Sequence, residues 1–215
     1  MIFVDRRDAG QRLAAALVHL RDGRPFVLAI PRGGVVVGRE VADALGAPLD
    51  VIVPRKLRAP FNPELAIGAV AEGGAVFIDD ATAYAVTEAY LDAEVALQRQ
   101  EIARRVTAYR GDRALPDLSG RTAIVVDDGI ATGATLVAAL RAARGLGPAR
   151  LVAAVPVAPP EGLARLAREA DEVVCLSAPT TFYAVGQFYD DFRQVEDDEV
   201  IALLAARHGA GPGET

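Results

Sequence analysis

Five short apolar runs constrain the fold of this chain more than any other feature of its sequence. Each is rich in Val, Ile, Leu or Ala, and none alternates between apolar and polar residues. Strands that are buried on both faces have this pattern, which is typical of parallel sheets covered by helices. The predicted strands are residues 26–30, 51–54, 123–126, 151–157 and 172–176.

Helical stretches follow several of these runs. Residues 35–45 end at Gly46 and residues 134–146 end at Gly147, and glycine is common just beyond a helix C-terminus. Strands that alternate with helices predict an α/β fold, with an open and mostly parallel sheet and helices on both faces. We expect one domain over residues 1–215, because 52% of its residues are apolar and can cover such a sheet.

Two segments interrupt this alternation. Residues 57–121 form a long insertion, predicted as a hairpin that turns at Gly73 and Gly74 and a helix over about 86–110. Long insertions of this kind often serve as lids or dimer elements. Residues 179–195 are rich in aromatic side chains and are called the hood below, and a closing helix is expected over about 198–207.

Charge and cysteine usage narrow the classes of partner. The formal net charge is −6 and no run of Lys or Arg stands out, which disfavours nucleic acid. No apolar stretch is long enough for a membrane span, and the charged start of the chain lacks the pattern of a signal peptide. A single cysteine, Cys175, suits a reducing compartment, so we expect a cytoplasmic protein.

The most informative segment is AIVVDDGIATGAT, residues 123–135. A buried strand places two adjacent carboxylates, Asp127 and Asp128, at its C-terminal end, where ligands bind in open α/β sheets. A turn of small and hydroxyl residues then leads into a helix, whose free N–H groups and dipole favour a phosphate. The turn consists of Ala131, Thr132, Gly133, Ala134 and Thr135.

The two carboxylates indicate that the phosphate belongs to a larger ligand. They suit a molecule whose hydroxyls or metal lie near its phosphate, as in ribose 5-phosphate. A Walker A loop does not fit, because Ala134 occupies the place of its lysine, and the glycine spacing of a dinucleotide fingerprint is absent. The other interpretation is an ordinary strand, turn and helix with polar turn residues.

A second anion site is predicted where basic residues and glycines follow the first two strands. After the first strand, a PRGG turn leads into a helix, which is an anion-binding geometry. The second strand is expected to end in VPRKLR, so its basic residues would lie at the same edge of the sheet. A plain turn and a solvated basic cluster are the alternatives. The residues concerned are Arg32, Gly33 and Gly34 after the first strand, and Arg55 and Lys56 after the second.

These motifs together resemble those of type I phosphoribosyltransferases. Two acids followed by GIATGAT are similar to their 5-phosphoribosyl 1-diphosphate motif, and PRGG is similar to the diphosphate loop of bacterial xanthine-guanine enzymes. The resemblance implies that catalytic Asp127 and Asp128 hold the ribose hydroxyls and that residues 131–135 bind the 5-phosphate. It implies a cis peptide bond before Arg32. The implied diphosphate contacts are Arg32, Gly33, Gly34, Arg55 and Lys56, with the choice between the last two left open.

The resemblance also implies the cofactor and the partners. Mg²⁺ is expected to arrive with the substrate, with Asp127 and Asp128 as candidate ligands and no dedicated metal site, and a homodimer is compatible with the family. The insertion corresponds in position to the mobile loop that closes over the site in this family. Its Glu64, Glu72 and Arg110 are candidate contacts, although ordinary structural roles are favoured for them.

The hood, FYAVGQFYDDF, is similar to the base-binding segment of hypoxanthine-guanine enzymes. By position Tyr183 would stack on a base and Asp190 would contact it, with an aromatic core cluster as an equal alternative. Those enzymes have a lysine after the fourth strand, whereas the segment AVPVAPPEG has none. The acceptor is therefore left open between a purine, a pyrimidine and another nucleophile.

The resulting prediction is a glycosyltransferase that moves 5-phosphoribosyl from 5-phosphoribosyl 1-diphosphate to a base or another nucleophile and releases diphosphate. One alternative is a non-catalytic regulator that binds phosphoribosyl diphosphate or a nucleotide. Another is a different sugar-phosphate or nucleotide enzyme on a similar sheet, because a fold alone does not decide the activity.

Overall fold

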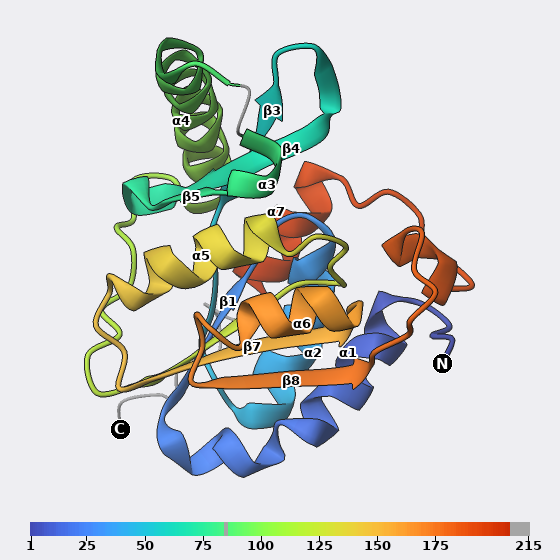
Figure 1. The fold of residues 1–215 in the computed structure, drawn as a ribbon. Helices are drawn as coiled ribbons and strands as arrows, with labels where there is room; N and C mark the ends of the chain where they lie inside the picture. Colours follow the sequence, from blue (N-terminus) through green and yellow to red (C-terminus); the bar gives the residue numbers. More distant parts are fainter. Residues whose placement is uncertain (84–85, 207–215) are drawn as a thin grey trace.

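A five-stranded parallel sheet forms the centre of the molecule in the computed structural model, which describes residues 1–83 and 86–206, without the side chains of residues 63 and 64. The strand order is β2-β1-β6-β7-β8 (Figure 1). The α/β fold predicted from the apolar runs is confirmed, and each run overlaps a strand. These strands are β1 (Pro25–Ala29), β2 (Leu49–Val51), β6 (Thr122–Val126), β7 (Arg150–Val157) and β8 (Glu172–Ser177).

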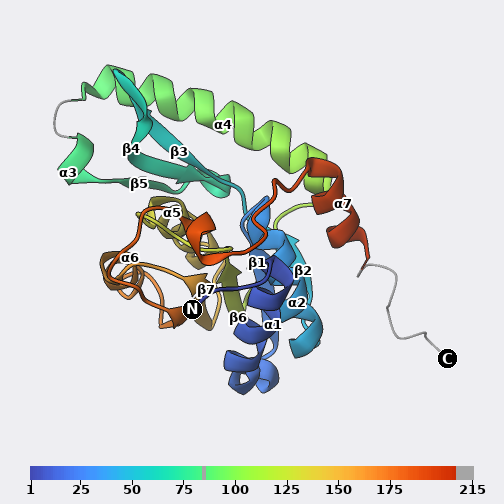
Figure 2. The ribbon, with the colours of Figure 1, turned by 90° about the vertical axis from the view of Figure 1, so that its right-hand side faces the viewer.

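Helices cover both faces of this sheet (Figures 1 and 2). In β1, Val27 packs into the hydrophobic cluster of one face and Leu28 into that of the other. This double burial explains why the strands read as continuous apolar runs. The first cluster includes residues of α1 (Arg6–Ala16), α2 (Gly33–Leu45) and α7 (Asp197–Ala205), and the second includes residues of α5 (Ala134–Arg144) and α6 (Pro160–Leu166).

Helix α1 was not predicted from the sequence. It begins after Asp5, whose carboxylate accepts a hydrogen bond from the Asp8 N–H at 2.9 Å and so caps the first turn. The helix packs closely on α2, because a Cβ on Gly10 would lie only 2.8 Å from Glu40 Cβ. A glycine in a helix interior is a poor sequence signal for a helix, although here it permits the close packing.

The insertion forms a small antiparallel sheet with a long helix beside it (Figure 2). The predicted hairpin is confirmed, with its turn at Glu72–Gly74, and the predicted helix is α4. The prediction over 179–207 is also close, with a short 3-10 turn at Val185–Phe188 before α7. The insertion begins at Pro54, before the predicted start at residue 57, and it contains β3 (Pro54–Ala59), β4 (Asn62–Ala71), β5 (Val76–Ile78), α3 (Asp80–Ala83) and α4 (Glu88–Arg110).

The expected end of the second core strand was wrong. β2 ends at Val51, and the chain enters the small sheet at Pro54, so Arg55 and Lys56 lie within β3 and not at the end of a core strand. The connecting Ile52 and Val53 are themselves fully buried. The apolar run therefore continues from β2 through the connection to β3, and the sequence pattern does not show where β2 ends.

A buried arginine anchors the insertion to the core. The Arg110 side chain, 1% exposed, donates hydrogen bonds to Asp50 Oδ1 at 3.2 Å and to the Val51 carbonyl, and it pairs with Glu72. Glu72 and Arg110 thus have the structural role that was favoured over a lid contact, whereas Glu64 lies outside the described side chains. No helix within the described residues has the length and apolar character needed to cross a membrane.

Candidate active site

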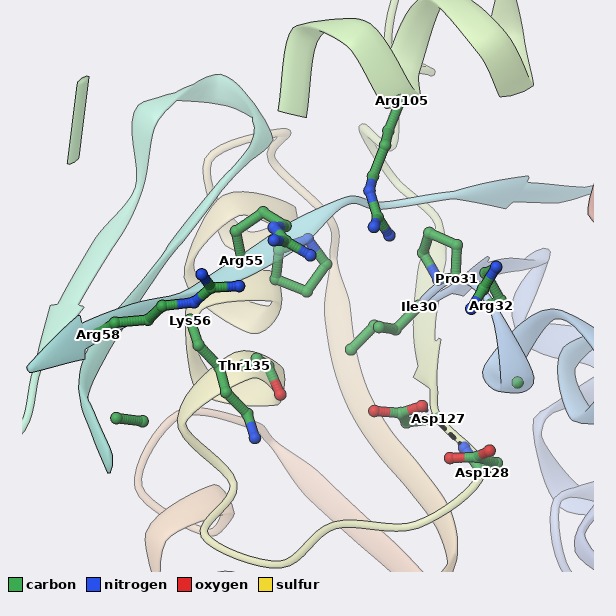
Figure 3. Close-up of a pocket in the computed structure, with 13 residues that line it drawn as sticks. Ile30, Pro31, Arg32, Arg55, Lys56, Arg58, Arg105, Asp127, Asp128 and Thr135 are labelled. Carbon is green, nitrogen blue, oxygen red and sulfur yellow. Dashed lines mark hydrogen bonds between the residues drawn. The ribbon is translucent and has the colours of Figure 1, made fainter. Parts of the chain in front are cut away.

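A cavity of about 480 Å³ lies at the carboxyl ends of β1 and β6, beneath the small sheet (Figure 3). Because parallel strands end at the same edge, this position brings together segments that are distant in sequence. The cavity is lined by Ile30, Pro31, Arg32, Gly33, Pro54, Arg55, Lys56, Arg58, Ala66, Arg105, Asp127, Asp128 and Thr135.

The acid pair follows β6 directly. The Asp128 N–H donates to Asp127 Oδ1 at 2.9 Å, and Arg6 Nε donates to Asp128 Oδ2 at 2.7 Å. Burial, together with the neighbouring charge of Asp128, holds the pKa of the Asp127 carboxyl well above its ordinary value. Burial also raises the pKa of Asp128, while Arg6 acts in the opposite direction. The two adjacent acids are therefore in different electrostatic environments.

The Arg32 loop, residues 31–34, runs into the first turn of α2 and lies beside this pair. The peptide bond between Pro31 and Arg32 is cis, which confirms the expectation drawn from the resemblance. A Cβ on Gly34 would lie 3.0 Å from Asp127 Cα, so the loop packs against the backbone that follows β6. Glycine here permits a close approach between two parts of the protein, in addition to any approach by a ligand.

The turn after the acids leads into α5. Gly133 has φ of +80°, a left-handed conformation that favours glycine, and no side chain within the described residues caps the first turn of the helix. Thr135 lines the cavity, whereas Thr132 is exposed. The N-terminus of α5 thus leaves backbone donors for an anion, which is the geometry expected from residues 131–135.

Four basic side chains of the insertion line the other side of the cavity: Arg55, Lys56 and Arg58 from β3, and Arg105 from α4. Figure 3 shows Arg105 extending from α4 toward the space above Pro31 and the acid pair. Burial and the nearby charge of Arg105 lower the pKa of Arg55. Such a concentration of positive charge suits a multiply charged anion.

The hood is only partly associated with the cavity. Tyr183 is 87% exposed, Asp190 is also exposed, and neither lines the cavity. Phe188 and Tyr189 instead join Phe3 in a buried cluster, as the aromatic-core alternative expected. The Tyr189 hydroxyl donates to the backbone carbonyl of Asp128, so this cluster helps to hold the backbone of the acid pair.

Sequence reasoning missed four polar or charged side chains at or beside this cavity: Arg6, Arg58, Arg105 and Tyr189. Arg58 could have been predicted from the sequence, because it lies two residues after Lys56 on the short strand β3. Arg6 is 122 positions from Asp128, and Arg105 lies on a helix rich in charged residues. Only tertiary structure distinguishes these two arginines from their exposed neighbours.

The phosphoribosyl transferase domain model matches residues 5–193 of this chain. The chain belongs to the phosphoribosyltransferase family. It is 48% identical to the "Putative phosphoribosyl transferase Rv0571c" of Mycobacterium tuberculosis over 209 residues, which cover 96% of this chain and 47% of that protein. The corresponding protein of a second strain, MT0597, has the same identity and coverage. The chain thus spans about half the length of the curated relatives it matches.

The structure of this phosphoribosyltransferase family member is similar to the crystal structure of TT1426 from Thermus thermophilus. The two share 48% sequence identity with a TM-score of 0.82, over 96% of this chain and 99% of the other. Family membership agrees with the resemblance drawn from the two acids and the PRGG segment. The phosphoribosyltransferase fold places both segments at one cavity, although they are far apart in the sequence.

Proposed function

We propose that the protein is a Mg²⁺-dependent phosphoribosyltransferase that transfers 5-phosphoribosyl from 5-phosphoribosyl 1-diphosphate to a nucleophile and releases diphosphate. The observation that carries this proposal is the division of charge within one cavity. Asp127 and Asp128 lie on one side with the Arg32 loop beside them, and the basic side chains of β3 and α4 lie on the other. A ribose whose hydroxyls face the carboxylates, and whose diphosphate reaches the Arg32 loop and these basic side chains, matches this arrangement.

The proposed binding mode follows from the position of each group. Asp127 and Asp128 accept hydrogen bonds from the ribose hydroxyls. The backbone of residues 131–135 binds the 5-phosphate at the start of α5. The diphosphate lies against the Arg32 loop, including Gly33 and Gly34, and against the basic side chains of β3 and α4. Arg55 and Lys56 both line the cavity, so both are assigned to the diphosphate.

Mg²⁺ fits the chemistry of this site. Carboxylate oxygens are ligands that Mg²⁺ prefers, and burial that raises the pKa of both carboxyls makes a divalent cation beside them favourable. Across the described residues, no group of three or more His, Cys, Asp or Glu side chains gathers around one point. Most ligands would therefore come from diphosphate and water. When bound, the metal would neutralise charge that develops on the departing diphosphate.

The chain's own groups would assist the same displacement. The C1–O bond to diphosphate breaks while the nucleophile bonds to C1, so the ribose becomes transiently cationic and the leaving oxygens become more negative. Fixed arginines on the diphosphate side and fixed carboxylates near the ribose stabilise this separation of charge. The small sheet and α4 lie over one side of the cavity and would limit the access of water, which competes as nucleophile.

Tyr183 and Asp190 are proposed as acceptor contacts, which requires the acceptor to extend beyond the present cavity toward the hood. The protein is also proposed to act in the cytoplasm on small molecules, and a homodimer is compatible with this function.

A binding and turnover assay tests the proposal. Isothermal titration calorimetry with 5-phosphoribosyl 1-diphosphate and Mg²⁺ should show binding, and a screen of purines, pyrimidines and other nucleophiles should identify an acceptor that releases diphosphate. Asp127→Asn and Asp128→Asn should each lower turnover by about 100-fold or more. Exposed Asp22→Asn serves as the matched control. Binding without release for any acceptor would favour the regulator, and no binding would refute both.

A further inference from the structure

We propose that Arg6 is a positioning residue that holds Asp128 in the orientation in which it binds a ribose hydroxyl. This inference rests on the proposed function and assigns a role to a residue outside every motif recognised in the sequence. Arg6 is the first residue of α1, a helix that otherwise packs on α2 away from the cavity. Its side chain nevertheless reaches the acid pair.

The guanidinium of Arg6 is fixed by three different contacts. Its Nε donates to Asp128 Oδ2 at 2.7 Å, and one terminal nitrogen donates to the Arg193 carbonyl at 2.8 Å. The Phe192 ring centroid lies 3.9 Å from the guanidinium carbon. A planar group held at two edges and one face has little freedom, and lysine could not reproduce this arrangement.

This ion pair is largely shielded from water. The side chains of Arg6 and Asp128 are 10% and 15% exposed, respectively. Exposed ion pairs contribute little because water screens them, whereas a partly buried and hydrogen-bonded pair loses much when one partner is removed. The Arg32 loop packs tightly against this pair, because a Cβ on Gly33 would lie only 2.6 Å from Arg6 Nε.

The two acids of the pair are held in different ways. Asp127 accepts from the Asp128 backbone N–H, whereas the Asp128 side chain is held by Arg6, and the Asp128 carbonyl accepts from Tyr189. The Asp128 backbone would therefore remain in place without Arg6, and the orientation of its carboxylate would not. Loss of Arg6 should thus affect recognition at one carboxylate more than the fold around it.

Discrimination between sugars reports on this role. A site that uses hydrogen bonds to recognise a hydroxyl rejects the analogue that lacks it, because a polar group is then left without a partner. Ribose 5-phosphate should bind more tightly than 2-deoxyribose or 3-deoxyribose 5-phosphate, whichever hydroxyl Asp128 contacts. If Arg6 positions Asp128, replacing Arg6 should reduce one of these two discrimination ratios.

The experiment measures these three sugar phosphates by calorimetry with Mg²⁺ present. Arg6→Gln should reduce one ratio by about tenfold, and Arg6→Lys should give an intermediate value. Arg12→Gln is the matched control, because Arg12 lies on the same helix, pairs with Asp8 and is more exposed. In an Asp128→Asn background, Arg6→Gln should have little further effect on either ratio.

The outcomes separate this inference from the function on which it rests. Unchanged ratios in a folded Arg6→Gln or Arg6→Lys variant would overturn the inference alone, and so would an equal loss of affinity for all three sugars. If Arg6→Gln fails to fold, the Arg6→Lys ratios decide. If the unmodified protein binds neither 5-phosphoribosyl 1-diphosphate nor ribose 5-phosphate, the proposed function fails and the inference falls with it.

Discussion

Gly33 lies against Asp128 so closely that a Cβ on Gly33 would be 2.0 Å from Asp128 Oδ2. Real Cβ atoms do not come this near to an oxygen, so the loop after β1 and the acid pair after β6 form one packed unit. The absence of a side chain at Gly33 therefore sets the position of the Asp128 carboxylate, in addition to leaving backbone available to an anion.

We predict that Gly33→Ala will displace Asp128 and weaken binding of 5-phosphoribosyl 1-diphosphate with Mg²⁺ by about tenfold or more, measured by calorimetry. Gly145→Ala is the control, because Gly145 has ordinary helical φ and ψ of −62° and −17° and the nearest atom to its Cβ would be 3.3 Å away. Undiminished binding by Gly33→Ala would show that the carboxylate position is not critical.

A pair of neighbouring arginines on α4 tests the role of the insertion. Arg105 lines the cavity and is 23% exposed, whereas Arg104 is 59% exposed and outside it, and both pair with Glu101. Arg105→Gln should weaken binding of 5-phosphoribosyl 1-diphosphate about tenfold, because a charge facing the proposed diphosphate position is lost. Binding of ribose 5-phosphate, which lacks the diphosphate, should change less.

Arg104→Gln provides the matched control, since it removes the same charge from the same helix and the same acidic partner. Its effect on both ligands should stay within about twofold, as expected for a screened surface charge. Equal effects of the two substitutions would mean that the arginines of α4 attract the ligand only by long-range electrostatics and that the diphosphate does not contact Arg105.

The core strands and the strand, turn and helix over residues 123–135 could be predicted from the sequence because their signals are local. A strand buried on both faces reads as an apolar run, and the acids, the turn and the start of α5 are consecutive between Asp127 and Thr135. No tertiary information is needed to connect a strand end with the helix that follows it. The same holds for the hairpin turn around Gly73, which glycine marks directly.

The remaining parts of the candidate site depend on contacts between distant segments. Ile52 and Val53 are buried between the two sheets, so hydrophobicity did not reveal where β2 ended and β3 began. Arg6 and Arg105 resemble other arginines on polar helices, and only packing directs them toward the cavity. The aromatic residues of the hood were compatible with base stacking and with a core cluster, because aromatic rings pack well against a base and within a protein core.

Arg110 should be far more important for stability than its place at the end of α4 suggests. It is buried with Asp50 and Glu72, and its removal would leave two carboxylates without their cation. Arg110→Ala should lower the free energy of unfolding by about 3–5 kcal/mol, measured by urea denaturation. The exposed Arg104→Ala should lower the free energy of unfolding far less. Similar losses for both would contradict a specific anchoring role.

Asp127 should make the protein less stable as the pH rises. Burial and the charge of Asp128 raise its pKa in the folded state above the ordinary value of 3.8. Between these two pKa values the native state binds the proton more strongly than the unfolded state does. The free energy of unfolding therefore falls through this window, and the loss is complete above the folded-state pKa. Asparagine does not ionise, so Asp127→Asn should be the more stable protein at about pH 7.

Urea denaturation of both proteins from about pH 3 to pH 8 checks this expectation. The difference in unfolding free energy should be small at the acidic end and should grow in favour of Asp127→Asn as the pH rises. Asp128→Asn should gain less stability than Asp127→Asn as the pH rises, because Arg6 opposes the burial that raises the pKa of Asp128 and because the substitution leaves the buried guanidinium of Arg6 without its carboxylate. If both variants gain equally, the two acids share one environment and the asymmetry imposed by Arg6 is absent. A gain for Asp127→Asn would mean that Asp127 is retained at a cost in stability, as expected for a residue whose role is in binding or catalysis.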